Sequence, residues 1–198
     1  GAIINPIPFS VSESELVKTF NFIEPKLIFL EPFNSEKCSD RFNTFIVSPL
    51  EKNFKDILSQ YSNKYREIDF NSEDPCCCYY TSGTTSNPKA ILYSHKNMLS
   101  LIGSICSEFG HNRNSVHLGI LPMGHTAITN YSFLPVLYCG AKMLFSENFI
   151  KIRSNFWDII KDNEITYVQT VPTVLFTIMN TKYRNSSLES LKLEYIGC

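Results

Sequence analysis

The chain has 198 residues, of which 43% are hydrophobic and 19% are charged, and its formal net charge at pH 7 is -1. This near-neutral balance gives no electrostatic reason to expect a nucleic acid or an anionic membrane as a partner. Because no apolar run approaches the roughly 20 residues that a membrane-spanning helix needs, we expect no transmembrane segment.

Short apolar runs alternate with helical patterns in the first part of the chain. Ser12 and Glu15 have the spacing of a capping box and predict a helix whose Leu16 and Phe20 recur on one face. Ser94 is placed to cap a second long helix. Strands are predicted over residues 2–7, 26–30, 44–47, 76–80 and 90–94, with a further helix near 51–61.

The clearest turn cluster is at residues 110–114, and we place there the boundary between two lobes, 1–110 and 111–198. Pro172 has the position of a first-turn proline and starts a predicted helix. The alternation of strands and helices predicts an α/β fold with doubly wound, mostly parallel sheets in two lobes. Other helices are predicted over 127–138 and 152–159, and strands over 116–122, 141–145, 166–171 and 193–197.

The chain contains seven cysteines, three of which are adjacent at positions 76–78. Neighbouring cysteines on a strand point to opposite faces, so this cluster is more typical of a buried strand than of a disulfide framework. No CxxC pair or nearby histidine completes a set of metal ligands. We therefore predict structural thiols and no metal site, with a redox or zinc role as the less favoured alternative. Reduced thiols indicate a reducing, cytoplasmic compartment.

A hydroxyl-rich loop with the sequence TSGTTSNPK follows the cysteine strand. Backbone N–H groups of a tight loop bind anions, a glycine lets the backbone approach a ligand closely, and hydroxyls and a lysine add donors and charge. An ordinary solvated turn is the alternative that the residues alone leave open, and the GxxxxGK[ST] pattern of a Walker A loop is absent. For a generic polar loop the solvated turn is the favoured interpretation, and a polyphosphate site here would use Ser82, Gly83, Thr84, Thr85 and Lys89 as its donors and positive charge.

The stretch YTSGTTSNPKAILYSHKNM resembles the phosphate-binding motif of the adenylate-forming superfamily, which includes acyl-CoA synthetases, firefly luciferase and the adenylation domains of peptide synthetases. The family pattern is close to YTSGTTGxPKGVxxSHxN. This chain departs from it at Ser86 and Ala90, where the family usually has glycine. Further segments resemble the family in order along the chain, namely GAIINPI, LPMGHTAITNYSFLPVLYCGAKMLF, ITYVQTVPTVLFTIM and LKLEYIGC.

The resemblance implies part of the large N-terminal domain of an enzyme that joins a carboxylic acid to ATP and then transfers the acyl group to a thiol, usually that of coenzyme A. It implies that Thr81, Ser82, Gly83, Thr84, Thr85 and Lys89 hold the β- and γ-phosphates of ATP. It places His125 near the carboxylate and the α-phosphate, as a catalytic and substrate-binding residue. Pro172 and Thr173 correspond to a substrate-binding helix start that lines the acyl pocket, although an ordinary helix-start proline is equally compatible. Gly124 stands where the family usually has an aromatic residue, and loss of that ring is expected to enlarge the acyl pocket or remove a gate.

The family's ribose-binding and hinge motifs, its C-terminal catalytic lysine and the glutamate that helps hold Mg²⁺ would all lie beyond Cys198, so we expect an N-terminal-region fragment that is inactive alone. In the family, peptide-synthetase adenylation domains commonly have an aspartate near the LPMGHT position that pairs with the substrate amine. Because this chain has no acidic residue between Met123 and Phe133, a small-molecule carboxylic acid without an amino group is the expected substrate. The alternatives are an amino-acid adenylation domain of a peptide synthetase and a nucleotide-binding module without catalytic activity. Apolar surface left uncovered in such a fragment would favour self-association.

Overall fold

The computed structural model describes residues 1–8, 11–29, 45–47, 54–62, 64, 67–81, 89–146, 148–180 and 190–198. The chain divides into two compact units, one of residues 1–10 with 70–198 and one of residues 11–69. The lobe boundary placed at residue 110 on sequence grounds stays a prediction. Among the described residues, we find no helix with the length and hydrophobicity of a transmembrane segment.

The described part of the smaller unit contains two helices and a pair of parallel strands. Helix α1 (Glu13–Ile23) begins with the predicted capping box, in which the Ser12 and Glu15 side chains and backbone N–H groups are paired. Strands β1 (Leu27–Phe29) and β2 (Phe45–Val47) are parallel neighbours, and α3 (Phe54–Ser59) follows them. These elements confirm the helices and strands predicted in this region.

A hairpin of β3 (Pro75–Thr81) and β4 (Lys89–Ser94) departs from the otherwise parallel pairing. The seven residues 82–88 connect the two strands, which is too short for the crossover that parallel neighbours require. The strand predicted over residues 2–7 is reduced to an isolated parallel bridge between Ile4 and Cys77. Pro6 lacks an N–H group and cannot extend that ladder.

Helix α4 (His95–Glu108) continues directly from β4 and confirms the cap predicted at Ser94. The Ser94 hydroxyl accepts a hydrogen bond from the N–H of Asn97, whose side-chain oxygen accepts from the N–H of Ser94. The turn after the helix contains Gly110 with a φ of 64°, a left-handed conformation that favours glycine.

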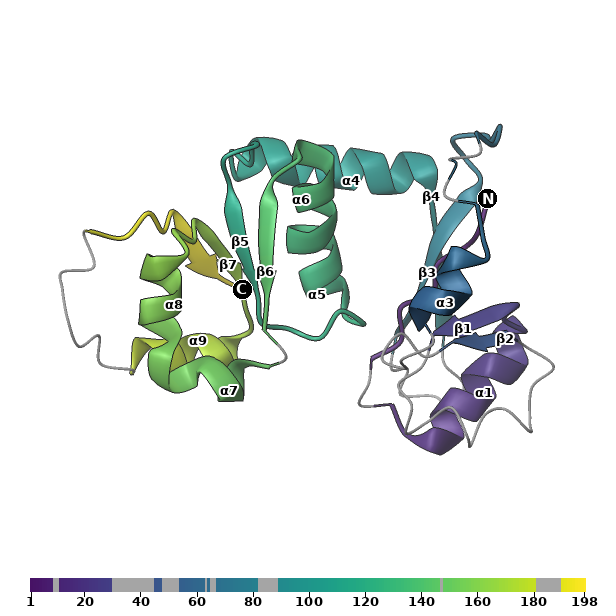
Figure 1. Cartoon of the computed structure of the whole chain (residues 1–198), viewed down its shortest axis with the longest axis horizontal. Helices are drawn as coiled ribbons and strands as arrows, with labels where there is room; N and C mark the ends of the chain where they lie inside the picture. The colour runs from purple at the N-terminus through teal and green to yellow at the C-terminus, as the bar shows by residue number, and fades with distance from the viewer. Residues whose placement is uncertain are drawn as a thin grey trace. The chain divides into compact units, whose positions relative to one another are not determined.

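The larger unit also contains a four-stranded parallel sheet in the order β6-β5-β7-β8 (Figure 1). The order of the strands in the sheet differs from their order in the sequence at β5, because β6 lies on one side of it and β7 on the other. The predicted strand over 116–122 ends earlier, at Gly119, before the turn that contains Pro122. The strands are β5 (Val116–Gly119), β6 (Lys142–Phe145), β7 (Tyr167–Gln169) and β8 (Tyr195–Gly197).

Helices cover both faces of this sheet, which confirms the predicted doubly wound α/β class (Figure 1). On one face, α8 (Phe156–Asp162) and α9 (Pro172–Met179) bury a core built from Leu118, Ile160 and Val168. On the other face lies a helix of three parts, α5 (Thr126–Ile128), the π-helix η1 (Thr129–Phe133) and α6 (Leu134–Cys139). The short helices α7 (Phe149–Ile152) and η2 (Arg153–Asn155) precede α8.

Candidate functional site

The hairpin of β3 and β4 closes the predicted phosphate-binding loop at its base. Thr81 and Lys89 are the last registered pair of the two antiparallel strands, and the Lys89 side chain is exposed. An exposed lysine at the mouth of a loop is free to reach an anionic ligand as a point charge. The loop residues predicted beside it, Ser82, Gly83, Thr84 and Thr85, lie outside the described residues.

His125 occupies the N-cap position of α5, in the turn that follows β5. Its side chain is exposed and forms no capping hydrogen bond. The buried Thr129 hydroxyl binds the main chain around His125. It lies 2.9 Å from the carbonyl oxygen of Met123 and 3.0 Å from that of His125. The turn is therefore anchored while the imidazole remains available to a ligand.

A hydrogen bond connects the strand that leads into the predicted phosphate-binding loop with the helix that follows His125. The Tyr79 hydroxyl on β3 donates to the side-chain oxygen Oδ1 of Asn130 on η1 over 3.2 Å, and both residues are buried. Burial is the main cause that raises the pKa of Tyr79, so its hydroxyl stays protonated as a donor. Thr129 and Asn130 are adjacent, so one turn of η1 holds both the His125 main chain and β3.

The start of α9 lies at the same edge of the sheet as the His125 turn. β5 and β7 are parallel neighbours, so the segments that leave their carboxyl ends emerge side by side. Pro172 and Thr173 are exposed in the first turn of α9, whose N-cap residue Val171 provides no side-chain cap. Strand order reverses here, and in open α/β sheets ligands bind outside the carboxyl ends of strands at such a point.

Gly124 is packed against the main chain of the N-terminal segment. A Cβ atom added at this position would lie 2.5 Å from the Cα atom of Pro8 and 2.6 Å from the carbonyl carbon of Ile7. Backbone atoms cannot rotate away as the end of a side chain can, so the space beside Gly124 is filled. An opening created by the missing ring at this position does not agree with that packing.

Thr129 and Asn130 were not singled out by the sequence patterns. The signal in the sequence was a group of polar residues within a strongly apolar predicted helix, namely Thr129, Asn130 and Ser132. The structure shows that all three are buried. Such a run interrupts an apolar face and needs hydrogen-bond partners elsewhere in the fold. The π-helix in which they lie is a feature found frequently at functional sites.

A buried aromatic cluster under η1 was also missed. His117 is completely buried with both ring nitrogens unpartnered, and its ring centroid lies 4.5 Å from that of His111 and 4.6 Å from that of Tyr167. Burial, with a smaller contribution from His111, lowers the pKa of His117 to about 3. This histidine is therefore neutral at ordinary pH and is part of the core.

The described residues contain no group of three or more histidine, cysteine or acidic side chains that could hold a metal ion. Cys77 and Cys78 are buried on β3, in agreement with the predicted structural thiols. The six cysteines within the described ranges are all free.

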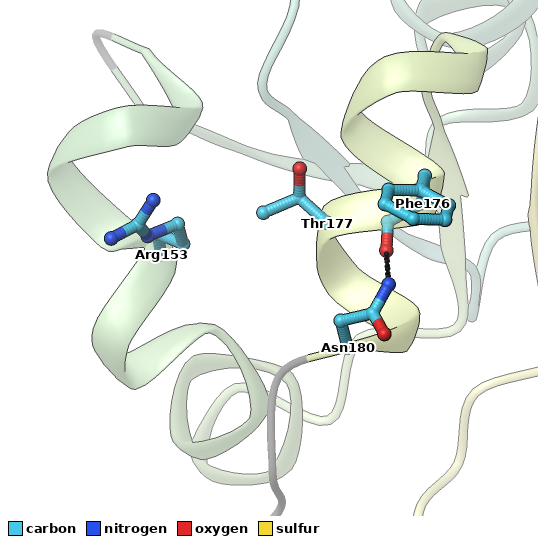
Figure 2. A pocket seen from close by; sticks show the side chains of 4 residues that line it. All are labelled: Arg153, Phe176, Thr177 and Asn180. Carbon is cyan, nitrogen blue, oxygen red and sulfur yellow. Dashed lines mark hydrogen bonds between the residues drawn. The ribbon is translucent and has the colours of Figure 1, made fainter.

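A cavity of about 460 Å³ is lined by residues other than Lys89, His125, Pro172 and Thr173, and Figure 2 shows its lining. It is lined by Arg153 on η2 and by Phe176, Thr177 and Asn180 at the carboxyl-terminal part of α9. The Asn180 amide donates a 2.7 Å hydrogen bond to the carbonyl oxygen of Phe176 (Figure 2). Thr173, a predicted site residue, lies one helical turn from the cavity, and its carbonyl oxygen accepts a 2.9 Å hydrogen bond from the Thr177 hydroxyl.

Comparisons with known proteins agree on one family. The family model for AMP-binding enzymes matches residues 1–197. The 2-methylpropanoate–CoA ligase CCL4 of Humulus lupulus is 26% identical over 158 residues, which are 79% of this chain and 27% of that protein. Surfactin synthase subunit 2 of Bacillus subtilis is 28% identical over 125 residues, which are 60% of this chain and 3% of that protein.

The crystal structure of ATP-bound MatB from Rhodopseudomonas palustris has a similar fold. It matches with a TM-score of 0.80 and 20% identity, over 90% of this chain and 36% of that chain. The chain therefore spans less than two fifths of the length of each of these proteins.

Proposed function

Because the chain belongs to the AMP-binding enzyme family, we propose that it is the part of an ATP-dependent carboxylate-activating ligase that holds the phosphates and one wall of the acyl site. In the first step a carboxylate oxygen attacks the α-phosphorus of ATP, the bond to the β-phosphate oxygen breaks, and pyrophosphate leaves. In the second step the sulfur of a thiol, that of coenzyme A, attacks the acyl carbon and AMP leaves.

The observation that carries this proposal is the pair of contacts made by neighbouring residues of η1. Asn130 binds Tyr79, two residues before the base of the phosphate loop, and Thr129 binds the main chain of His125. A reaction between two anions needs phosphate-binding groups and carboxylate-binding groups at a fixed separation. Contacts from a single helical turn to both segments supply such a constraint.

The residue roles follow from their chemistry. Lys89 supplies positive charge to the β- and γ-phosphates, and the loop residues Thr81 to Thr85 supply hydroxyl and backbone donors. His125 donates a hydrogen bond to the carboxylate or the α-phosphate oxygen from its exposed imidazole. Pro172 and Thr173 border the acyl chain at the start of α9. Mg²⁺ would neutralise phosphate charge, and the described residues contain no cluster of acidic side chains that could hold it.

An amino-acid substrate is the second candidate, and the similarity to Surfactin synthase subunit 2 suggests it. A plain carboxylic acid is favoured over it, because the segment from Met123 to Phe133 contains no acidic residue to pair with an ammonium group. The similarity to a CoA ligase fits coenzyme A as the thiol acceptor. A nucleotide-binding module without catalytic activity is the third candidate.

The test uses the longest natural protein that contains this sequence, incubated with ATP, Mg²⁺ and a panel of carboxylic acids and amino acids. We expect labelled pyrophosphate to exchange into ATP in the presence of one class of carboxylic acid, and an acyl thioester to form when coenzyme A is added. Exchange that depends on amino acids alone would support the second candidate. Binding of ATP without exchange for any acid would leave only the nucleotide-binding module.

A further inference from the structure

α4 and α6 meet in an apolar seam that contains a pair of cysteines. Met98, Ile102 and Cys106 form a buried cluster on α4, and Leu134 and Cys139 pack against it from α6. Both cysteines are free thiols, and their Sγ atoms lie 3.3 Å apart. Disulfide bonds have an S–S distance of about 2.0 Å, so the sulfur atoms need to approach by little more than about 1 Å to bond.

We propose that Cys106 and Cys139 are an oxidation site that forms a reversible disulfide bond between α4 and α6. The seam holds the two sulfurs close together, because Cys139 also lies 3.4 Å from the carbonyl oxygen of His111. Two helices thus keep the thiols together before any oxidant arrives. This inference does not depend on the proposed function.

The difference in exposure between the two thiols sets the order of the reaction. Cys139 is half-buried at the end of α6, whereas Cys106 is 7% exposed. Burial, together with the hydrogen bond from Cys139, raises the pKa of Cys106 to about 12, so its thiol stays protonated and competes poorly for an oxidant.

The oxidant that balances the reaction is a peroxide. The Cys139 thiolate attacks one oxygen of hydrogen peroxide, the O–O bond breaks and hydroxide leaves, which gives a sulfenic acid. The sulfur of Cys106 then attacks the Cys139 sulfur, its proton is lost, and the sulfenic oxygen leaves as water. One peroxide is reduced to two waters while two thiols are oxidised to one disulfide.

The bond would restrain the segment that contains β5 and the His125 turn, because both lie between positions 106 and 139. It would also join α4, which continues from the phosphate-loop hairpin, to the end of the helix that follows His125. Closing a chain segment reduces the conformational entropy of the unfolded state, so the oxidised protein is expected to unfold at a higher temperature.

The test treats the folded 198-residue chain with hydrogen peroxide, blocks remaining thiols with an alkylating reagent, and maps disulfide-linked peptides by mass spectrometry. We expect a peptide that links positions 106 and 139, a mass loss of two hydrogen atoms, full reversal by a thiol reductant, and a Tm higher by about 5 °C or more. Cys139→Ser should abolish the linkage and the rise in Tm. Cys76→Ser and Cys198→Ser, which change a cysteine that packs beside the seam and an exposed one, should keep both.

Two results would overturn the proposal. One is the absence of a 106–139 linkage while Cys139 is oxidised to sulfinic acid, since that outcome shows that Cys106 does not reach it. The other is a linkage that forms equally well after mild unfolding in urea, since that outcome shows that the folded seam does not favour the pairing.

Discussion

Tyr79 and Asn130 lie 51 positions apart in the sequence and are joined by a hydrogen bond of 3.2 Å between the phenol and the amide oxygen. This bond connects the strand that leads into the predicted phosphate-binding loop with the helix that follows His125. It therefore relates two sequence motifs that would otherwise be independent.

Replacement of Tyr79 by Phe should destabilise the chain, because the Asn130 oxygen loses its donor in a site where that residue is only 4% exposed. A buried acceptor left unpaired costs about 1–3 kcal/mol. The free energy of unfolding, measured by urea denaturation, reports the loss. Tyr80→Phe is the matched control, since its hydroxyl bonds Asn5 in a less buried position and should cost less. Equal losses for the two variants would contradict a special role of the Tyr79 bond.

Substitutions of His125 and Thr129 should affect activity and stability differently. His125→Ala removes an exposed side chain that makes no capping bond, so we expect unchanged stability and a fall in adenylation rate of about 100-fold. Thr129→Val removes the bonds to Met123 and His125 and should lower both quantities. Pyrophosphate exchange in the longer protein and urea denaturation measure them. A His125→Ala variant with full exchange activity would contradict the catalytic assignment.

Lys89→Gln should weaken nucleotide binding through the loss of one positive charge at the base of the phosphate loop. A charge-assisted contact contributes about 1.5–3 kcal/mol, which corresponds to a loss of affinity of roughly 10- to 100-fold. Fluorescence polarisation with a labelled ATP analogue measures it. Lys96→Gln removes the same charge from a lysine paired with Glu73 at 2.7 Å on α4 and should leave affinity near that of the unmodified chain. Equal weakening by both would indicate a nonspecific effect of net charge.

Gly124→Ala should destabilise the larger unit, because the added methyl group meets the Pro8 and Ile7 main chain. Overpacking of this kind costs about 1–3 kcal/mol. Gly103→Ala is the contrasting change in α4, where the nearest heavy atom to an added Cβ is 3.9 Å away. It should stabilise the helix by about 0.5–1 kcal/mol. We expect the urea midpoint to be lower for Gly124→Ala and higher for Gly103→Ala than for the unmodified chain. A Gly124→Ala chain as stable as the unmodified one would show that the N-terminal segment moves aside.

His117 should make the fold sensitive to mild acid. Its pKa is lowered from 6.5 to about 3 in the folded chain, so below pH 6.5 the unfolded chain binds a proton that the folded chain does not. The contribution of neutral His117 to the free energy of unfolding is therefore fully present above pH 6.5. It decreases as the pH drops toward 3, by at most roughly 1.4 kcal/mol per pH unit.

The pH dependence can be assigned with two variants. His117→Phe keeps an aromatic ring but cannot be protonated, so its unfolding free energy should change less between pH 7 and pH 5 than that of the unmodified chain. His125→Ala, which removes an exposed histidine, should keep the full dependence. Identical slopes for all three chains would place the acid sensitivity elsewhere.

Much of the fold was determined by patterns that are local in the sequence. Apolar residues at helical spacing, the capping boxes at Ser12 and Ser94, and the first-turn proline at Pro172 each correspond to a helix in the structure. Alternation of strands and helices predicted the α/β class. The motif around residues 81–89 indicated the family without any knowledge of tertiary contacts.

Only the tertiary structure decided which of these segments meet. It paired β3 with β4 in the antiparallel sense, brought the turns after β5 and β7 to one sheet edge, and placed Tyr79 against Asn130. It also placed the Pro8 main chain in the space beside Gly124 and Cys139 beside Cys106. Periodicity and capping depend on residues within a few positions of each other, whereas these contacts join residues that only the packing of the whole unit brings together.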